Sequence, residues 1–135
     1  MPLFVQFISN WYKFYRGQAT EESKAVLVTY LGKLEGQLKD GRPFFFGQEM
    51  TAGDLLVWPW FERLEAAQKS FPAVADLVTK EKFPLVYAWM ERMWAQEVVK
   101  AAGVTTEAHH RFFESIKGQH DYDVLGHDIT MYVKA

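Results

Sequence analysis

The sequence predicts an all-α fold, a helical bundle. Apolar residues recur at helical spacing in successive segments of the 135-residue chain, so that each segment can bury one face against the others. Glycine, proline and capping residues separate these segments. No segment combines strict alternation of apolar and polar residues with flanking turns, which is the pattern of a strand.

Two helices are predicted before residue 40. From residue 3 to residue 16, apolar and aromatic side chains recur at helical spacing, and Gly17 can end this helix. Thr20 then offers an N-terminal cap, followed by two glutamates that suit the positive end of a helix. The second helix is expected to run to about Lys39, where an Asp-Gly pair breaks it.

The start of the third helix carries the most specific local signal. Thr51 and Asp54 have the spacing of a capping box, and Met50 and Leu55 are placed to form a hydrophobic staple around it. Because this box accounts for both polar residues, we interpret them as structural rather than catalytic. The helix that follows is apolar around most of its circumference, which predicts the buried centre of the bundle, and Pro59 should kink it or loosen one turn.

The rest of the chain is divided by the same signals. We expect a helical bundle domain over residues 1–118 and a C-terminal tail over residues 119–135, which is a candidate for docking onto that domain. The remaining helices are predicted at residues 72–78, from Pro84 onward, at 97–102 before Gly103, and from Thr105 or Thr106 to 117.

Composition excludes several classes of function. A net charge of −2 gives no broad electropositive field, so nucleic acid is not an expected partner. The absence of cysteine excludes a disulfide framework and a cysteine nucleophile within these residues. The first residues lack a basic signal-peptide region, and no apolar run is long enough for a bilayer, so we predict no membrane partner and a cytoplasmic location. Aromatic residues, at 16%, exceed what a small core needs and favour an apolar groove or an interface.

Four histidines were considered as metal ligands. They lack the spacing of a helical metal site, so we predict no metal and interpret them as surface residues. They are His109, His110, His120 and His127.

Arg63 leaves two interpretations open. It could hold a substrate that bears a carboxylate or a thiol, or it could be a solvated side chain paired with Glu62 or Glu91. The second interpretation is favoured because surface arginines commonly form such pairs.

One run of residues resembles a known family. It comprises residues 34–35 (Leu-Glu), 45–47 (Phe-Phe-Gly), 51–54 (Thr-Ala-Gly-Asp) and 58–65 (Trp-Pro-Trp-Phe-Glu-Arg-Leu-Glu). It resembles the C-terminal helical domain of an omega-class glutathione transferase. The Trp-Pro-Trp-Phe-Glu-Arg string is characteristic of that class, and the capping box is shared more widely among glutathione transferases. The resemblance extends, more loosely, from about residue 2 to about residue 113.

The resemblance implies two domains with different roles in binding and catalysis. Members of the family carry an N-terminal thioredoxin-like domain that binds glutathione and holds the catalytic cysteine. The helical domain supplies one wall of the site for the second, apolar substrate. Omega-class enzymes perform glutathione-dependent thiol transfer and dehydroascorbate reduction. By position, the residues matching the substrate wall are Trp11, Tyr15, Trp60, Arg63 and Phe113.

The 135 residues do not include the thioredoxin-like domain that the resemblance implies. We therefore expect no catalytic residue and no cofactor in this chain, with glutathione relevant only if such a domain is present. The isolated chain should not catalyse thiol transfer. Its expected partner is the missing domain, and Trp11 and Tyr15 should then be exposed.

Two other functions remain open. The chain could be a standalone, non-enzymatic module that binds an apolar small molecule or a protein partner, including a second copy of itself as a homodimer. A metal-dependent enzyme built on His120 and His127 is the weakest alternative.

Overall fold

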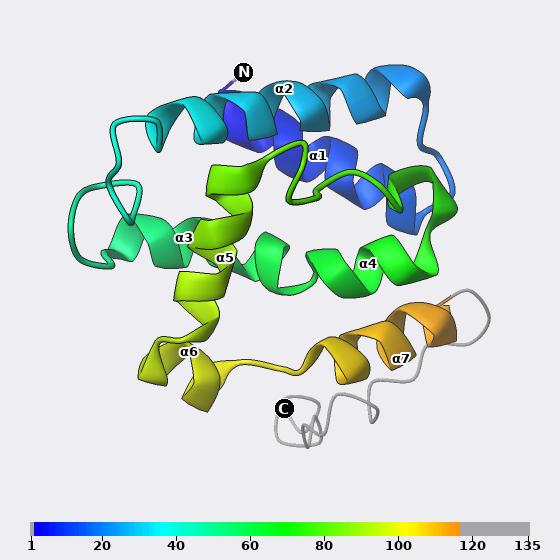
Figure 1. The fold of residues 1–135 in the computed structure, drawn as a ribbon. Coiled ribbons are helices and arrows are strands. Elements are labelled where there is room, and N and C mark those ends of the chain that lie inside the picture. Colours follow the sequence, from blue (N-terminus) through cyan, green and yellow to red (C-terminus); the bar gives the residue numbers. More distant parts are fainter. Residues whose placement is uncertain (1, 117–135) are drawn as a thin grey trace.

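The computed structural model describes residues 2–116, and they form an all-α fold (Figure 1). Between those residues there is no β-strand, only an isolated bridge between Phe44 and Gly47. The predicted fold class is therefore confirmed. Over the same residues, no helix has the length and apolar character needed to cross a membrane. The elements are α1 Leu3–Tyr15, α2 Glu21–Gln37, α3 Ala52–Glu62, α4 Leu64–Ser70, the 3₁₀ turn η1 Pro72–Val74, α5 Pro84–Trp94, α6 Glu97–Ala102 and α7 Thr106–Ile116.

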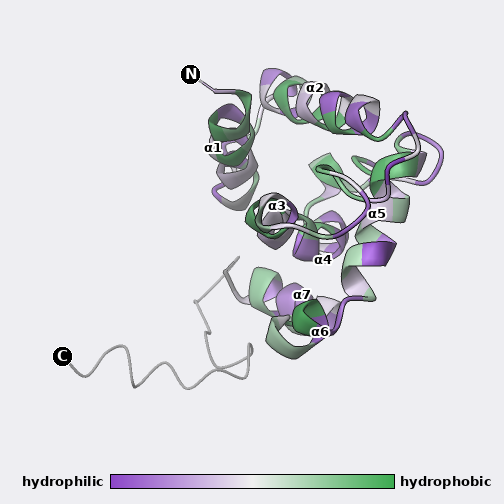
Figure 2. Ribbon diagram, turned by 90° about the vertical axis from the view of Figure 1, so that its left-hand side faces the viewer, coloured by the Kyte–Doolittle hydropathy of each residue, from purple (hydrophilic) through white to green (hydrophobic). Residues whose placement is uncertain are grey.

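The helices are arranged around the consecutive helices α3 and α4. Figures 1 and 2 both show α3 and α4 lying between the α1–α2 pair on one side and α7 on the other. Helix α5 contacts α2 near its start and then crosses the layers to α6. This arrangement brings the ends of α3, α5 and α6 together with the start of α7.

The sequence signals at the ends of α1 and α2 act as predicted. Gly17 adopts the left-handed conformation, with φ +66°, and the next amide donates back to the Lys13 carbonyl at 2.9 Å. The Thr20 side chain accepts a hydrogen bond from the Ser23 amide at 3.1 Å and so caps α2. Helix α2 ends at Gln37, slightly before the expected Lys39.

Aromatic rings fill much of the core. Phe7 of α1 lies 4.4 Å from the ring of Tyr30 on α2 and 6.2 Å from Phe61 on α3, centroid to centroid. On the other side of Phe61, the Trp89 ring of α5 packs edge-on at 5.1 Å. These contacts join four helices through a few rings, so the core is built from large side chains with fixed geometry.

Helix α3 is not buried all round, so that prediction is wrong. Leu55 is 40% exposed and Leu56 is 64% exposed. Pro59 lies inside α3, and the helical break falls later, at Arg63. The apolar residues of α3 therefore lie on two faces, one buried in the core and one exposed at the surface. The segment after Pro72 is also shorter than predicted, because its helical turn ends at Val74.

The predicted starts of the later helices agree with the structure. Pro84 occupies the first turn of α5, and Gly103 follows the end of α6. The Thr105 hydroxyl accepts a hydrogen bond from the Ala108 amide at 3.2 Å, which identifies Thr105 as the cap of α7. The predicted tail, residues 119–135, lies outside the described residues.

Candidate functional site

Asp54 is fully buried, with 0% exposure, and both of its carboxylate oxygens accept hydrogen bonds. Its Oδ2 accepts hydrogen bonds from the Thr51 amide at 3.0 Å and the Thr51 hydroxyl at 3.2 Å. The capping box predicted from Thr51 and Asp54 is therefore confirmed. Its Oδ1 accepts hydrogen bonds from the Phe45 amide and from the Trp89 indole, each at 3.0 Å.

Through its bonds to Phe45 and Trp89, Asp54 also holds other segments of the chain in place, in addition to capping α3. They fix the loop before α3 and the middle of α5 to the start of α3. A buried carboxylate is tolerated when every oxygen is hydrogen-bonded, as it is here. The interpretation of Asp54 as a structural residue is strengthened, because its carboxylate accepts four hydrogen bonds within the chain and is fully buried.

A second carboxylate fixes α5 from another helix. Glu35 of α2 accepts hydrogen bonds from the Leu85 and Val86 amides, at 2.9 and 2.8 Å. These amides belong to the first turn of α5, where backbone donors have no helical partner. Glu35 therefore caps α5 across the bundle, and a negative charge there also suits the helix dipole.

A third carboxylate joins α3 to the chain before α7. Glu62 Oε2 lies 3.2 Å from His109 Nε2, and its Oε1 accepts a hydrogen bond from the Val104 amide at 3.1 Å. The imidazole of His109 is buried, with only 4% of the residue exposed. A Cβ on Gly103 would lie 2.7 Å from Glu62 Oε1 and 2.6 Å from the Val99 carbonyl oxygen. Glycine at 103 thus lets the Glu62 carboxylate approach the backbone.

The interpretation of His109 as a surface residue is wrong, because Glu62 and the core enclose it. His110 also has a specific partner, since its Nδ1 lies 2.9 Å from the Ser70 hydroxyl. His120 and His127 lie outside the described residues. Within residues 2–116, no three potential ligands gather in a way that could hold a metal ion.

Trp11 and Trp60 belong to one aromatic cluster between α1 and α3. Trp11 is only 1% exposed and stacks on Phe7 at 6.0 Å, so the expectation that it is exposed is wrong. Trp60 is half-buried and packs edge-on against Phe4 at 5.8 Å. Its indole Nε1 is inaccessible to solvent and has no hydrogen-bond partner among the described residues. Burial in the same cluster raises the pKa of Tyr30 to about 12.

The other predicted wall residues lie elsewhere. Phe113 of α7 is buried and packs edge-on against Phe71 at 5.6 Å. Tyr15 is the last residue of α1, and its side chain is outside the described set. The structure therefore packs Trp11 and Trp60 on two different rings of α1, Phe7 and Phe4, and places Phe113 in a separate contact. A substrate-contact role for these residues stays a prediction.

Arg63 lies at the junction between α3 and α4 and is half-buried. Glu62 is bonded to His109 and Val104, and the Glu91 carboxylate lies 3.7 Å from the Lys80 ammonium. Neither of the two carboxylates expected to pair with Arg63 does so, and within the described chain its guanidinium makes no ion pair. The interpretation of Arg63 as a residue paired with Glu62 or Glu91 is wrong.

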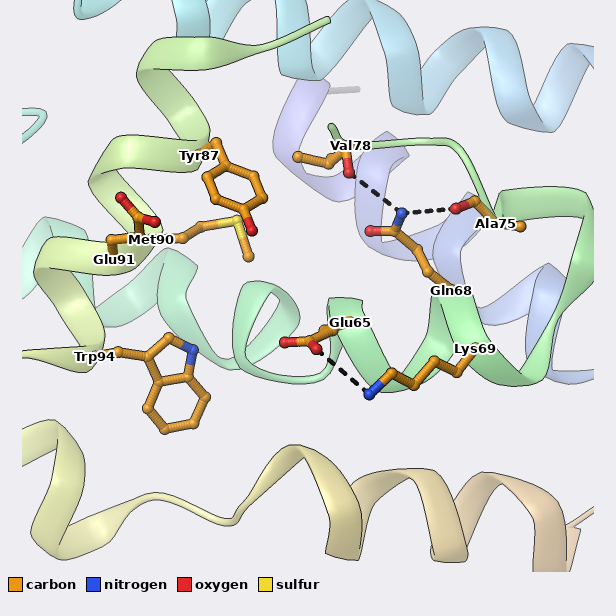
Figure 3. A pocket seen from close by; sticks show the side chains of 9 residues that line it. All are labelled: Glu65, Gln68, Lys69, Ala75, Val78, Tyr87, Met90, Glu91 and Trp94. Carbon is orange, nitrogen blue, oxygen red and sulfur yellow. Dashed lines mark hydrogen bonds and ion pairs between the residues drawn. The ribbon is translucent and has the colours of Figure 1, made fainter. Parts of the chain in front are cut away.

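A cavity with a volume of about 420 Å³ lies between α4 and α5 (Figure 3). Tyr87, Met90 and Trp94 project into it from α5, facing Glu65 on α4. No pattern in the sequence indicated this cavity. Its lining residues come from α4, from α5 and from the segment after η1, and these parts of the chain meet only in the folded structure. The full lining is Glu65, Gln68, Lys69, Ala75, Val78, Tyr87, Met90, Glu91 and Trp94.

Apolar side chains also gather on the outer face of α3. Phe46 is 69% exposed, and its ring lies so close to Gly53 that a Cβ there would overlap it, which places Phe46 on the first turn of α3. Leu56 follows Gly53 by one helical turn, and Leu55 shares a shallow groove with Val98 of α6. We call these exposed residues, Phe46, Leu55, Leu56 and Val98, the α3 patch.

Comparison with known proteins shows the family. The family described as "Glutathione S-transferase, C-terminal domain" matches residues 17–92, which extend from the end of α1 into α5. The chain is also similar to pyrimidodiazepine synthase of Drosophila melanogaster, with 31% identity over 91 residues, or 65% of this chain and 36% of that protein. The chain thus spans little more than a third of the length of this relative. This chain belongs to the glutathione S-transferase C-terminal domain family.

Proposed function

We propose that this chain is the helical second-substrate domain of an omega-class glutathione transferase-like protein. The observation that carries the proposal is the Trp-Pro-Trp-Phe-Glu-Arg string, which occupies α3 and its junction with α4 in a chain of the matching family. In the intact protein, the reaction would be glutathione-dependent thiol transfer or dehydroascorbate reduction. Such a protein belongs in the cytoplasm, where the reducing conditions maintain thiols.

The chain would supply binding rather than thiol chemistry. It has no cysteine, so the nucleophilic thiolate and the glutathione site would both come from a thioredoxin-like domain. Trp60 and Arg63 are the residues best suited to meet the second substrate. The Trp60 indole is a buried donor without a partner in the described chain, and the Arg63 guanidinium makes no ion pair there. An acceptor on a substrate would pair with the Arg63 guanidinium, whereas Trp60 would offer its ring as an apolar contact, because its Nε1 is inaccessible to solvent.

The α3 patch is the surface that we propose contacts the thioredoxin-like domain. It exposes four large apolar side chains over adjoining elements, and interfaces between domains of one chain commonly bury such surfaces. Leu55 and Leu56 of the patch lie on α3, and Arg63 follows the last residue of that helix, so a domain docked along α3 would come close to the α3–α4 junction.

The similarity to pyrimidodiazepine synthase supports a second candidate reaction for the whole protein. That name describes the relative and not this chain. A pyrimidodiazepine-forming activity would use the same helical domain, and formation of a pyrimidodiazepine by the full-length protein in place of dehydroascorbate reduction would favour this second reaction. The standalone module that binds an apolar ligand or forms a homodimer is the alternative if no larger protein exists.

The first test is the size of the native protein, detected with an antibody raised against this chain. A band well above 15.7 kDa supports the proposal, whereas a single band at 15.7 kDa contradicts it and favours the standalone module. The full-length protein should then reduce dehydroascorbate with glutathione, and the 135-residue chain alone should not.

Variants of the full-length protein test the two site residues. Trp60→Phe and Arg63→Gln should raise the KM for the second substrate and leave the KM for glutathione unchanged. Lys33→Gln, at an exposed position on α2, is the matched control for loss of a positive charge. Equal effects on both KM values would contradict the assignment of these residues to the second substrate.

A further inference from the structure

The cavity between α4 and α5 has one apolar wall and one charged edge. Tyr87, Met90 and Trp94 form the wall on α5, and they are half-buried. Glu65 and Glu91 stand at its edges on α4 and α5 (Figure 3). A volume of about 420 Å³ is within the range of small-molecule sites.

One end of the cavity is held in shape by Gln68. Its side-chain amide donates to the Ala75 carbonyl at 3.0 Å and to the Val78 carbonyl at 3.2 Å, as the dashed lines in Figure 3 show. These bonds tie the segment after η1 to α4. The cavity is therefore bounded on this side by fixed backbone, so it exists before any ligand arrives.

A cation already contacts two of the side chains that line this cavity, Tyr87 and Glu91. The Lys80 ammonium lies 5.1 Å from the centroid of the Tyr87 ring and 3.7 Å from the Glu91 carboxylate. An ammonium over an aromatic face and beside a carboxylate is the arrangement with which proteins recognise organic cations. Both Lys80 and Glu91 are largely exposed, so their pairing is weak and can be displaced.

We infer that this cavity binds a small organic ammonium ion with an apolar body. The ligand's cation replaces the Lys80 ammonium over Tyr87 and beside Glu91, and its apolar body lies against Met90 and Trp94. This site is separate from the proposed second-substrate wall, since its described lining includes none of Trp11, Trp60, Arg63 and Phe113.

The charges at the cavity support a cation rather than an anion once Lys80 has moved. Glu65 is paired with Lys69 at 3.4 Å, and Glu91 is paired with Lys80. When Lys80 is displaced, Glu65, Glu91 and Lys69 remain at the cavity, and their charges sum to one negative charge. Among the lining residues described, two carboxylates, Glu65 and Glu91, stand against one ammonium, that of Lys69, so the lining carries an excess of negative charge that disfavours an anion.

The test uses choline as the probe and 3,3-dimethylbutan-1-ol as its neutral isostere, at constant ionic strength. Binding is followed through the indole N–H resonance of Trp94 in NMR spectra of the 135-residue chain, assigned with Trp94→Phe. Choline should shift this resonance, and the neutral alcohol should bind about two- to fivefold more weakly, the ratio expected for a cation–π contact. Equal affinities, or no shift with choline, would overturn the inference.

Substitutions distinguish the roles of the three side chains around the cation. Glu91→Gln and Tyr87→Leu should each weaken choline binding about two- to fivefold, whereas Tyr87→Phe retains the ring and the affinity. Lys80→Met removes the competing ammonium and should strengthen choline binding. Lys33→Met, with the same charge change at an exposed position on α2, should leave it unchanged.

The Lys80→Met variant distinguishes a cation site from an anion site that would include Lys80. If Lys80 belonged to an anion site, Lys80→Met would weaken binding of the anionic probe acetate and would not improve choline binding. That result overturns the inference. Glu91 and Lys80 are surface side chains, so their variants should fold and the outcome can be read even if Tyr87→Leu is unstable.

Discussion

The indole N–H of Trp89 donates a hydrogen bond to Asp54 Oδ1 over 3.0 Å, and both residues are fully buried. This bond joins α5 to the first turn of α3. The same carboxylate holds Thr51 and Phe45, so one side chain fixes three segments of the chain. Buried polar networks of this kind stabilise a fold only while every member is paired.

Loss of the Asp54 carboxylate should be the most damaging of the substitutions that we consider. Asp54→Ala removes the cap of α3 and leaves the Phe45 amide and the Trp89 indole without an acceptor. We expect a loss of about 3–5 kcal/mol in the free energy of unfolding, measured by urea denaturation. Thr51→Ala, which keeps the carboxylate, should cost only about 1 kcal/mol. Similar losses for the two variants would contradict the central role of Asp54.

The capping of α5 by Glu35 predicts a smaller loss. Glu35→Ala leaves the Leu85 and Val86 amides without their acceptor and removes a charge that suits the helix dipole. The free energy of unfolding should fall by about 1–2 kcal/mol. Glu49→Ala makes the same change of charge at an exposed loop position and should have little effect. An equal response from the two variants would show that charge, and not capping, is responsible.

Two glycines should respond to alanine in opposite directions. A Cβ on Gly103 would lie 2.6 Å from the Val99 carbonyl oxygen, which is backbone and cannot move aside, so Gly103→Ala should destabilise the chain by about 1–3 kcal/mol. Gly32 lies inside α2 with nothing within 4 Å of an added Cβ. Gly32→Ala should therefore stabilise the chain by about 0.5–1 kcal/mol. Thermal unfolding of both variants checks this, and a loss at both positions would refute the packing argument at Gly103.

Local signals in the sequence were sufficient for most of the fold. Gly17, Thr20 and the Thr51–Asp54 pair act over a few residues, so their roles follow from spacing alone. The partners that Asp54 makes beyond its own turn could not be predicted, since Trp89 meets it only through the packing of α5. Glu62 and His109 are likewise far apart in the sequence, so the burial of His109 against Glu62 does not follow from the sequence pattern.

The candidate site was harder to predict than the fold. An apolar periodicity shows that rings share a helical face but does not show which of them remain accessible. Trp11 is in the core, whereas Leu55 and Leu56 of the helix expected to be central are exposed. In physical terms, the sequence of one domain does not distinguish a face buried within it from a face that a partner covers.

The buried phenol of Tyr30 predicts an alkaline limit to stability. Burial raises its pKa from 10.0 to about 12, because the charged phenolate would lose its hydration among Phe4 and Phe7. Between these values the unfolded chain releases the Tyr30 proton and the folded chain retains it. The stability contributed by this group is complete below pH 10 and falls as the pH rises towards 12, by about 2–3 kcal/mol. Tyr30→Phe cannot ionise, so its urea midpoint should decline less over this range than that of the unmodified chain. Parallel declines in the two proteins would show that Tyr30 titrates normally in the fold.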